Sequence, residues 1–362
     1  MYEKELNAIK KSNLYRQRKI FDENLIDLAS NDYLGLSSNE TLFKNAYENV
    51  LKQKYKSPKA SILVNGYSPI HKKFEDDLKK ANKFEEALVV GSGFLANVSM
   101  IEALVRKGDT LFIDEEYHAS GILASKLLKK EQVILFSHND YQDLENKIKN
   151  RETKGRFIIA IEGVYSMSGN IAHKEFFDIA SKYDSLLIVD EAHSSGVIGD
   201  NLLGIFDYYN IKPQKNHIKM GTLGKAYGSY GAYILSSKNI IDFLINRAKA
   251  VIYTTAPSLF DIALANESLK YILTNTNEIK TKIKDRQEVI KDELGIEAKS
   301  LIIAYEIGEN KKVLEIQKEI LANGYIVGAI RQPTVKSAII RLISKIDVSI
   351  NDLQKVCKLI KK

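Results

Sequence analysis

Short apolar runs alternate with amphipathic stretches from residue 87 onward, and this alternation constrains the fold more than any other feature of the chain. The runs predicted as strands are 87–90, 110–114, 133–137, 157–163, 186–192, 217–222 and 232–236. Strands separated by helical stretches build βαβ units, which give a mostly parallel sheet covered on both faces. The chain is therefore predicted to have an α/β fold, with ligands bound beyond the carboxyl ends of its strands.

The flanking segments divide the 362 residues into three parts. Residues 1–40 are predicted to form an N-terminal arm, and residues 41–245 contain the alternating pattern. After about residue 245 the pattern loosens into a long helical stretch over 258–293 and short β-prone runs such as 338–344. Residues 246–362 are therefore predicted to form a smaller α+β domain.

Composition excludes several classes of protein. A hydrophobic content of 44% with 27% charged residues is ordinary for a globular protein. The formal net charge of +7 comes mostly from scattered lysines, without an arginine-rich or basic–aromatic block, so nucleic-acid binding is not expected. The single cysteine, Cys357, has no partner for a disulfide, and no Cys/His cluster has the spacing of a metal site. No run approaches the roughly 18 apolar residues of a membrane span, and no leader pattern is visible, so a cytoplasmic protein is expected.

The stretch 220–231 holds Lys225 among four glycines, between two predicted strands. Glycines let the backbone adopt positive φ and approach a ligand closely. A lysine on such a loop is available to condense with an aldehyde, although a solvated surface lysine is the ordinary alternative in a lysine-rich chain.

The predicted strand 186–192 carries Asp190 near its end, with His193 three residues further on. A carboxylate, an imidazole and a glycine-flanked lysine are the groups that pyridoxal phosphate needs. The carboxylate keeps the pyridine nitrogen protonated, the imidazole reaches the ring oxygen, and the lysine binds the aldehyde carbon. Asp190, His193 and Lys225 together predict a pyridoxal phosphate enzyme.

The stretch 91–96, which contains Gly93 and Phe94, follows the predicted strand 87–90 and opens a helix. Backbone N–H groups at such a helix start can bind a phosphate. The same letters also match a dinucleotide fingerprint, with Asp114 as the ribose-binding acid, so an NAD-dependent dehydrogenase is an alternative. A structural turn, a phosphate cup and a dinucleotide site all fit this stretch taken alone.

Further loops at strand ends offer complementary side chains. His118 follows the run 110–114, Ser166 follows the run 157–163, and Thr254 and Thr255 supply paired hydroxyls shortly before a proline. Each is an ordinary turn or helix-start residue when taken alone. Their convergence on one edge of the sheet is typical of a cofactor site.

The order of these motifs resembles the α-oxoamine synthase family of pyridoxal phosphate enzymes of fold type I, from about residue 15 to residue 345. The segments that carry the resemblance are SNDYLGL at 30–36, GSGF at 91–94, YHAS at 117–120, EGVYSM at 162–167, VDEAHSSGV at 189–197, TLGK at 222–225 and AIRQPTV at 329–335. The sequence departs from the family pattern at 56–66, where a glycine–serine-rich loop is usual, and at Lys336 and Ser337.

The resemblance implies roles for individual residues. Lys225 would anchor the cofactor, Asp190 would pair with the pyridine nitrogen, His193 would bond the ring oxygen and His118 would stack on the ring face. The implied further contacts to the cofactor come from Gly93, Phe94, Ser166, Thr222, Thr254 and Thr255, and those to the substrate from Arg16, His118, Arg331 and Thr334.

The resemblance also implies the reaction, a decarboxylative condensation of L-alanine with a pimeloyl thioester carried on coenzyme A or a carrier protein. A homodimer with sites at the subunit interface is implied as well. The closest alternative is a sister synthase that uses glycine or another acyl-CoA, like 2-amino-3-ketobutyrate CoA ligase. A dehydrogenase and a cofactor-free binding homologue are the remaining alternatives, and a dehydrogenase would leave Asp190, His193 and Lys225 without roles.

Overall fold

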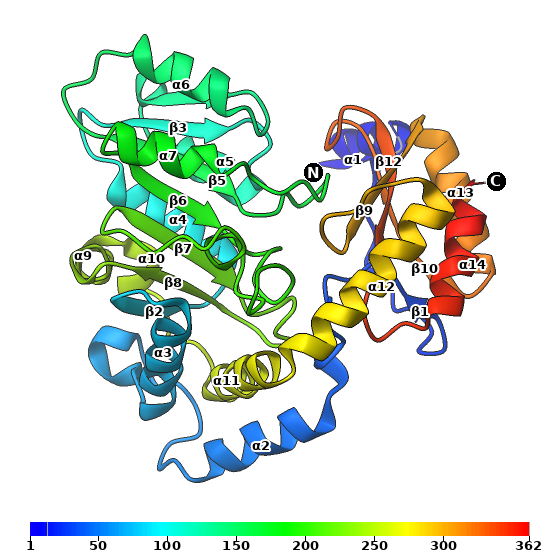
Figure 1. Ribbon diagram of the computed structural model, residues 1–362, viewed down its shortest axis with the longest axis horizontal. Coiled ribbons are helices and arrows are strands. Elements are labelled where there is room, and N and C mark those ends of the chain that lie inside the picture. Colours follow the sequence, from blue (N-terminus) through cyan, green and yellow to red (C-terminus); the bar gives the residue numbers. More distant parts are fainter. Residues whose placement is uncertain (13, 362) are drawn as a thin grey trace.

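A seven-stranded sheet forms the centre of the computed structural model, which describes residues 1–12 and 14–361 (Figure 1). The strand order is β2-β8-β7-β6-β5-β3-β4, and neighbours are parallel except that β8 runs antiparallel to β2 and β7. The strands are β2 Glu86–Val90, β3 Thr110–Asp114, β4 Val133–Phe136, β5 Phe157–Glu162, β6 Leu186–Asp190, β7 His217–Thr222 and β8 Ala232–Ser236. The predicted mostly parallel α/β sheet is confirmed.

Helices cover both faces of this sheet, which explains why its strands are almost continuously apolar. Along β3, Phe112 belongs to one core, whereas Leu111 and Ile113 belong to the other, as the alternation of side chains along a strand requires. The core that contains Leu111 includes α4 Gly93–Leu104, α5 Ala119–Ser125, α9 Lys238–Arg247 and α10 Lys249–Ile252. The opposite core includes α2 Glu40–Leu51, α3 Pro69–Asn82, α6 Tyr141–Lys149, α7 Glu175–Lys182, α8 Ile205–Tyr208 and α11 Leu259–Thr274.

A smaller unit lies beside the large one and has a core of its own (Figure 1). Its three-stranded antiparallel sheet has the order β11-β12-β9. A short parallel pair, β1 with β10, joins the N-terminal segment to this unit. The elements are β1 Ile26–Asp27, α12 Thr276–Leu294, β9 Ile302–Gly308, α13 Asn310–Ala322, β10 Tyr325–Ile326, β11 Gly328–Ile330, β12 Ala338–Ile343 and α14 Ile350–Lys361. The predicted smaller α+β part of the fold is confirmed.

The helical pattern over 258–293 forms two helices rather than one, with a break at Asn275 between α11 and α12. The helices α10 and α11 contribute to the cores on the large sheet, whereas Ile290 and Leu294 of α12 belong to the core of the smaller unit. We therefore propose that the boundary between the two units lies within α12, later in the chain than residue 246.

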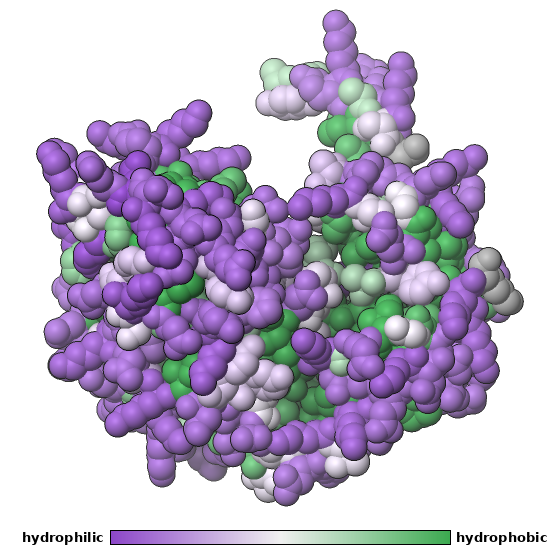
Figure 2. All heavy atoms as spheres, turned by 45° about the horizontal axis from the view of Figure 1, so that its top comes forward, coloured by the Kyte–Doolittle hydropathy of each residue, from purple (hydrophilic) through white to green (hydrophobic). Residues whose placement is uncertain are grey.

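The arm predicted at 1–40 contains the helix α1 Glu3–Lys11, which buries none of its residues. The apolar side chains of Leu6 and Ile9 are 45% and 40% exposed. Figure 2 shows a hollow between the two units, with apolar side chains at its base. No helix within the described part of the chain is long and apolar enough to cross a membrane.

Three short segments complete the elements: the 3-10 turns η1 Leu36–Ser38 and η3 Lys130–Gln132, and the π-helical turn η2 Ile62–Gly66. The Asn-Gly pair at the end of η2 leads into Tyr67, whose hydroxyl donates to Glu75 Oε2 at 2.5 Å. The backbone N–H of Val89 donates to Oε1 of the same carboxyl at 2.9 Å, which ties α3 to β2. Burial raises the pKa of Glu75 from 4.5 to about 7.

This raised pKa makes a prediction about stability. An acid whose pKa is higher in the folded protein than in the unfolded chain stabilises the fold at pH values below its pKa in the unfolded chain. That stability is lost as the pH rises through its pKa in the folded protein. Unfolding free energies of the wild type should fall between pH 4.5 and about 7, by up to roughly 3 kcal/mol from this group. Glu75→Gln should remove this component, as measured by denaturant unfolding at pH 5 and pH 8. The control Glu48→Gln, at an exposed carboxyl, should show the same difference in unfolding free energy between pH 5 and pH 8 as the wild type. The same difference in Glu75→Gln would contradict the prediction, because it would mean that the Glu75 carboxyl is charged at both pH values.

Candidate active site

Lys225 lies on the loop between β7 and β8, and its backbone is held from both sides. Leu223 and Ala226 are buried in the large core. Gly228 has φ +57°, and a Cβ there would come within 2.5 Å of the backbone nitrogen of Ser37, so this turn requires glycine. Burial lowers the pKa of Lys225 to about 8. About a tenth of the amine is therefore neutral and nucleophilic at pH 7, far more than for an ordinary lysine.

His193 contacts this amine directly. Its Nε2 lies 2.7 Å from Lys225 Nζ, and its Nδ1 lies 2.5 Å from the hydroxyl of Tyr33. Burial lowers the pKa of His193 well below 6.5, and the positive charge of Lys225 acts in the same direction. The ring is thus a neutral imidazole whose orientation is fixed by Tyr33.

Asp190 ends β6 in a polar network that crosses from the sheet to two helices. Asn97 Nδ2 donates to Asp190 Oδ2 and to Ser120 Oγ, both at 2.9 Å, and the Ala192 N–H donates to Asp190 Oδ1 at 3.0 Å. The Tyr117 hydroxyl in turn donates to Asn97 Oδ1 at 2.7 Å. The Asp190 carboxylate is therefore held by neutral donors at a site where a cationic ring nitrogen would supply the countercharge.

His118 forms another wall of the same site. Its Nδ1 lies 2.6 Å from Ser120 Oγ, which also accepts from Asn97. Burial lowers the pKa of His118. The hydrogen bond through Ser120 links the orientation of the His118 ring to the Asp190 network.

These side chains surround one cavity of about 160 Å³. The residues that line it are Gly93, Phe94, Asn97, His118, Glu162, Asp190, Ala192, His193, Met220, Thr222 and Lys225. The parallel register explains the convergence, because Glu162 pairs with Asp190 and Asp190 pairs with Met220 in successive strands. Every predicted catalytic residue lies in this cavity.

The remaining predicted cofactor contacts divide into two groups. Gly93 begins α4 at the cavity, with Ser92 as its N-cap, and Phe94 and Thr222 also line the cavity. A Cβ on Gly93 would lie 3.7 Å from the Cβ of Thr222, so this helix start lies against the end of β7. Ser166 is buried next to the cavity and donates its N–H to Glu162 Oε2 at 2.9 Å.

Thr254 and Thr255 lie at another place on the molecule. Thr255 forms a β-bridge with Ser61, and the Ala256 N–H donates to the Ala60 oxygen at 3.0 Å. This packing sets the two threonines against the segment 56–66, outside the lining of the Lys225 cavity. Their contact with a cofactor stays a prediction.

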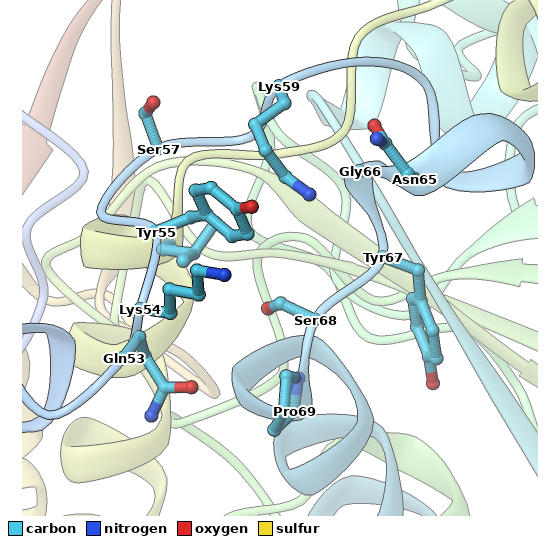
Figure 3. Close-up of a pocket in the computed structure, with 11 residues that line it drawn as sticks. Gln53, Lys54, Tyr55, Ser57, Lys59, Asn65, Gly66, Tyr67, Ser68 and Pro69 are labelled. Carbon is cyan, nitrogen blue, oxygen red and sulfur yellow. The ribbon is translucent and has the colours of Figure 1, made fainter.

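A second pocket of about 210 Å³ adjoins the segment 56–66 (Figure 3). The ammonium groups of Lys54 and Lys59 lie 5.4 and 4.2 Å from the centre of the Tyr55 ring. Hydroxyl groups of Ser57 and Ser68 complete this polar wall. The segment 56–66, where the sequence departs from the family pattern, thus lines a lysine-bearing pocket together with Lys54 and Tyr55.

Of the predicted substrate residues, His118 lines the cavity, whereas Arg16, Arg331 and Thr334 lie outside its lining. Arg16 lies on the exposed N-terminal segment. Arg331 and Thr334 follow β11 on a tip that is largely exposed. Within the same tip, Lys336 pairs with Glu115 at 3.1 Å, which brings the tip close to the segment that leads to His118. Their contact with a substrate stays a prediction.

The structure adds a residue that the sequence analysis missed, Arg341. It is buried in β12, and it donates from Nε to the Ser166 oxygen at 2.8 Å and from Nη2 to Asn31 Oδ1 at 3.0 Å. A single charge within the apolar strand Ala338–Ile343 was the available signal. Asn97 was also missed, because it lies within the apolar helix α4 and belongs to none of the strand-end motifs.

The dinucleotide interpretation fails at Asp114. This carboxylate is buried, with Oδ2 accepting from the Tyr165 hydroxyl and from the Asn139 N–H, each at 2.7 Å. Its Oδ1 accepts the Glu116 N–H at 2.8 Å. An acid whose two oxygens are bonded within the protein is not available to a ribose hydroxyl.

The residues present fit pyridoxal phosphate. The site combines a nucleophilic lysine, a buried carboxylate held by neutral donors and a helix start that can bind a phosphate. A buried oxygen, Glu162 Oε1, also lacks a hydrogen-bond partner within the described structure.

Comparisons with known proteins agree with this geometry. The family model for aminotransferase class I and II matches residues 23–360. The 8-amino-7-oxononanoate synthase of Helicobacter pylori J99 is 44% identical over 357 residues, which cover 98% of this chain and 95% of that protein. The solved structure of the Francisella tularensis 8-amino-7-oxononanoate synthase is 27% identical, with a TM-score of 0.78, covering 94% of this chain and 97% of that one.

Serine palmitoyltransferase from S. paucimobilis, solved with a bound pyridoxal phosphate adduct, shares the fold. The TM-score is 0.88 at 21% identity, over 99% of this chain and 96% of that one. The family model and the full-length relatives identify the family, and the shared fold agrees with them. The chain belongs to the aminotransferase class I and II family and, within it, to the α-oxoamine synthases of pyridoxal phosphate fold type I.

Proposed function

We propose that this protein is a pyridoxal phosphate-dependent acyltransferase that condenses L-alanine with a pimeloyl thioester, releasing carbon dioxide and a free thiol. The product would be 8-amino-7-oxononanoate, an intermediate of biotin biosynthesis. One observation carries the proposal: Lys225, Asp190 and His193 share a cavity in a chain that is 44% identical to a curated synthase of this name.

When bound, pyridoxal phosphate supplies an electron-withdrawing ring that stabilises negative charge on the amino acid. Asp190 would hold the proton on the ring nitrogen, because its buried carboxylate favours a cation next to it. Gly93 and the start of α4 would receive the phosphate, and His118 would cover one face of the ring. His193 would contact the ring oxygen from its fixed position beside Lys225.

Lys225 would do two things in turn, holding the cofactor and then moving a proton. The lowered pKa, about 8, leaves enough free amine to take the proton from Cα of alanine. His193, at 2.7 Å, keeps the amine directed into the cavity. The later reprotonation at carbon would use the same amine in its charged form.

Arg341 is the group best placed to bind the carboxylate of the amino acid. It is a buried cation whose charge lowers the pKa of both Lys225 and His193, so it lies within electrostatic reach of the reacting centre. Its Nε and Nη2 are held by Ser166 and Asn31. A guanidinium fixed in this way binds a carboxylate with little loss of conformational freedom.

The acyl substrate would enter past the tip that carries Arg331 and Thr334. The ion pair between Lys336 and Glu115 places this tip beside the segment leading to His118. A pimeloyl chain ends in a carboxyl group or its ester, and an arginine suits that end of the chain. Arg16 would contact the substrate from the N-terminal segment.

We also propose a homodimer. The N-terminal segment supports it, because Leu6, Ile9, Ile20 and Phe21 are exposed by 45%, 40%, 103% and 43%. Apolar side chains grouped on one segment favour a partner surface. Thr254 and Thr255 would then be available to a site shared between subunits.

Substrate choice tests the proposed reaction. Purified protein with pyridoxal phosphate is assayed with pimeloyl, acetyl and succinyl thioesters, each with alanine and with glycine. We expect the highest kcat/KM for pimeloyl with alanine, because Arg341 would bind the carboxylate of the amino acid while Arg331 suits the distal carboxyl group of the acyl chain. Preference for acetyl with glycine would assign the protein to a sister synthase with the same cofactor chemistry.

A second experiment tests the role of Asp190. In Asp190→Asn the amide cannot hold a proton on the ring nitrogen, so exchange of the alanine Cα proton with deuterium should slow by at least about 100-fold, or about 2.7 kcal/mol. Proton NMR measures the exchange, and Asp200→Asn, at an exposed carboxylate, is the control. Exchange at the wild-type rate in Asp190→Asn would rule out the assigned role.

A further inference from the structure

Glu162 is a buried carboxyl in the cavity wall, and only one of its two oxygens is satisfied. Oε2 accepts the Ser166 N–H at 2.9 Å. Oε1 has no hydrogen-bond partner within the described structure, although the side chain is only 1% exposed. A buried polar atom without a partner carries a desolvation penalty, which a ligand in the cavity would remove.

The strand order places this oxygen next to a particular edge of the cofactor. Glu162 and Asp190 are paired residues of adjacent parallel strands, so their side chains point to the same face of the sheet. The strand β2, which leads to the phosphate-binding start of α4, lies on the other side of β6 from β5. In pyridoxal phosphate, the phosphate arm and the ring hydroxyl flank the aldehyde carbon on opposite sides. With the nitrogen at Asp190 and the phosphate at α4, the hydroxyl edge faces Glu162.

We propose that Glu162 contacts bound pyridoxal phosphate through Oε1, as a neutral hydrogen-bond donor to the ring hydroxyl oxygen. This inference rests on the proposed function and deepens it, by assigning a residue that would hold the ring from the edge opposite the phosphate. His193 approaches the same oxygen from the side of Lys225, so the two residues would bracket it.

The charges around Glu162 explain why it would be a donor. The charged groups that face it are Asp190 on β6, Asp114 on β3 and Lys225 on the loop after β7. Two adjacent buried carboxyls do not both ionise readily. Asp190 has two neutral donors and faces the ring nitrogen, so it keeps the negative charge. Burial, followed by the charge of Asp190, raises the pKa of Glu162 well above its usual range.

Glu162 also supports the substrate site through Ser166. The Ser166 N–H binds Glu162, and the Ser166 oxygen accepts from Arg341. Loss of the Glu162 side chain should therefore disturb both the cofactor and the arginine. An uncharged replacement of the same shape should preserve both.

The test compares Glu162→Gln and Glu162→Ala with the wild type, with Glu48→Gln as a control at an exposed carboxyl on α2. Pyridoxal phosphate affinity is measured by fluorescence titration, and the pH midpoint of the cofactor absorbance is measured on the loaded proteins. Infrared difference spectra of the cofactor-free wild type and Glu162→Gln report a protonated carboxyl at neutral pH.

We expect Glu162→Gln to keep the affinity and the midpoint of the wild type, since an amide is also a neutral donor, and to lack the infrared band of the protonated carboxyl. Glu162→Ala should bind the cofactor about tenfold more weakly, the size of one buried hydrogen bond, with a displaced midpoint. If Glu162→Ala does not fold, the shorter Glu162→Asp takes its place with the same expectation.

Three results would overturn the inference while leaving the proposed function intact. One is unchanged affinity in Glu162→Ala, or in Glu162→Asp where it replaces that variant. Another is a midpoint in Glu162→Gln displaced by about one unit or more, because a removed charge changes a neighbouring pKa by that amount. The third is the absence of the infrared band from the wild type. Failure of the wild type itself to bind pyridoxal phosphate would contradict the proposed function as well.

Discussion

The buried carboxylate of Asp190 at the end of β6 is the constraint on which the site depends. An ionised carboxylate is costly to bury unless donors or cations surround it. Here the donors are Asn97 and the Ala192 N–H, and Asn97 is in turn held by Tyr117 and Ser120. This network joins β6 to α4 and to the start of α5. The walls of the cavity are therefore positioned by the same bonds that stabilise the charge.

The site lies where the two units of the protein meet. Asp190 ends β6 of the large sheet and His193 and Lys225 lie on the loops after β6 and β7, whereas Arg341 comes from β12 of the smaller unit. Tyr33 belongs to the N-terminal segment, which pairs with the smaller unit through β1 and β10. The packing of the two units against each other therefore sets the position of the guanidinium relative to the amine.

The sequence was sufficient to predict the sheet and the residues at its strand ends, because both signals are local. A buried strand followed by Asp190 or by Lys225 places the side chain on a known edge of the sheet. Arg341, Tyr33 and Asn97 were harder to predict as site residues. Arg341 and Tyr33 come from elements far in sequence from the strand-end motifs and act through contacts with Ser166 and His193, whereas Asn97 is a neutral polar residue within an apolar helix. Their selection depends on tertiary packing, and their local patterns are those of a strand, a turn and a helix.

The central claim is that the Lys225 amine is the group that binds the cofactor covalently. The most direct measurement is borohydride reduction of the protein with one equivalent of pyridoxal phosphate, followed by peptide mapping by mass spectrometry. The account predicts one modified residue, Lys225, because burial lowers the pKa of its amine to about 8 and His193 directs it into the cavity. Modification of a different lysine, with Lys225 unmodified, would contradict the account.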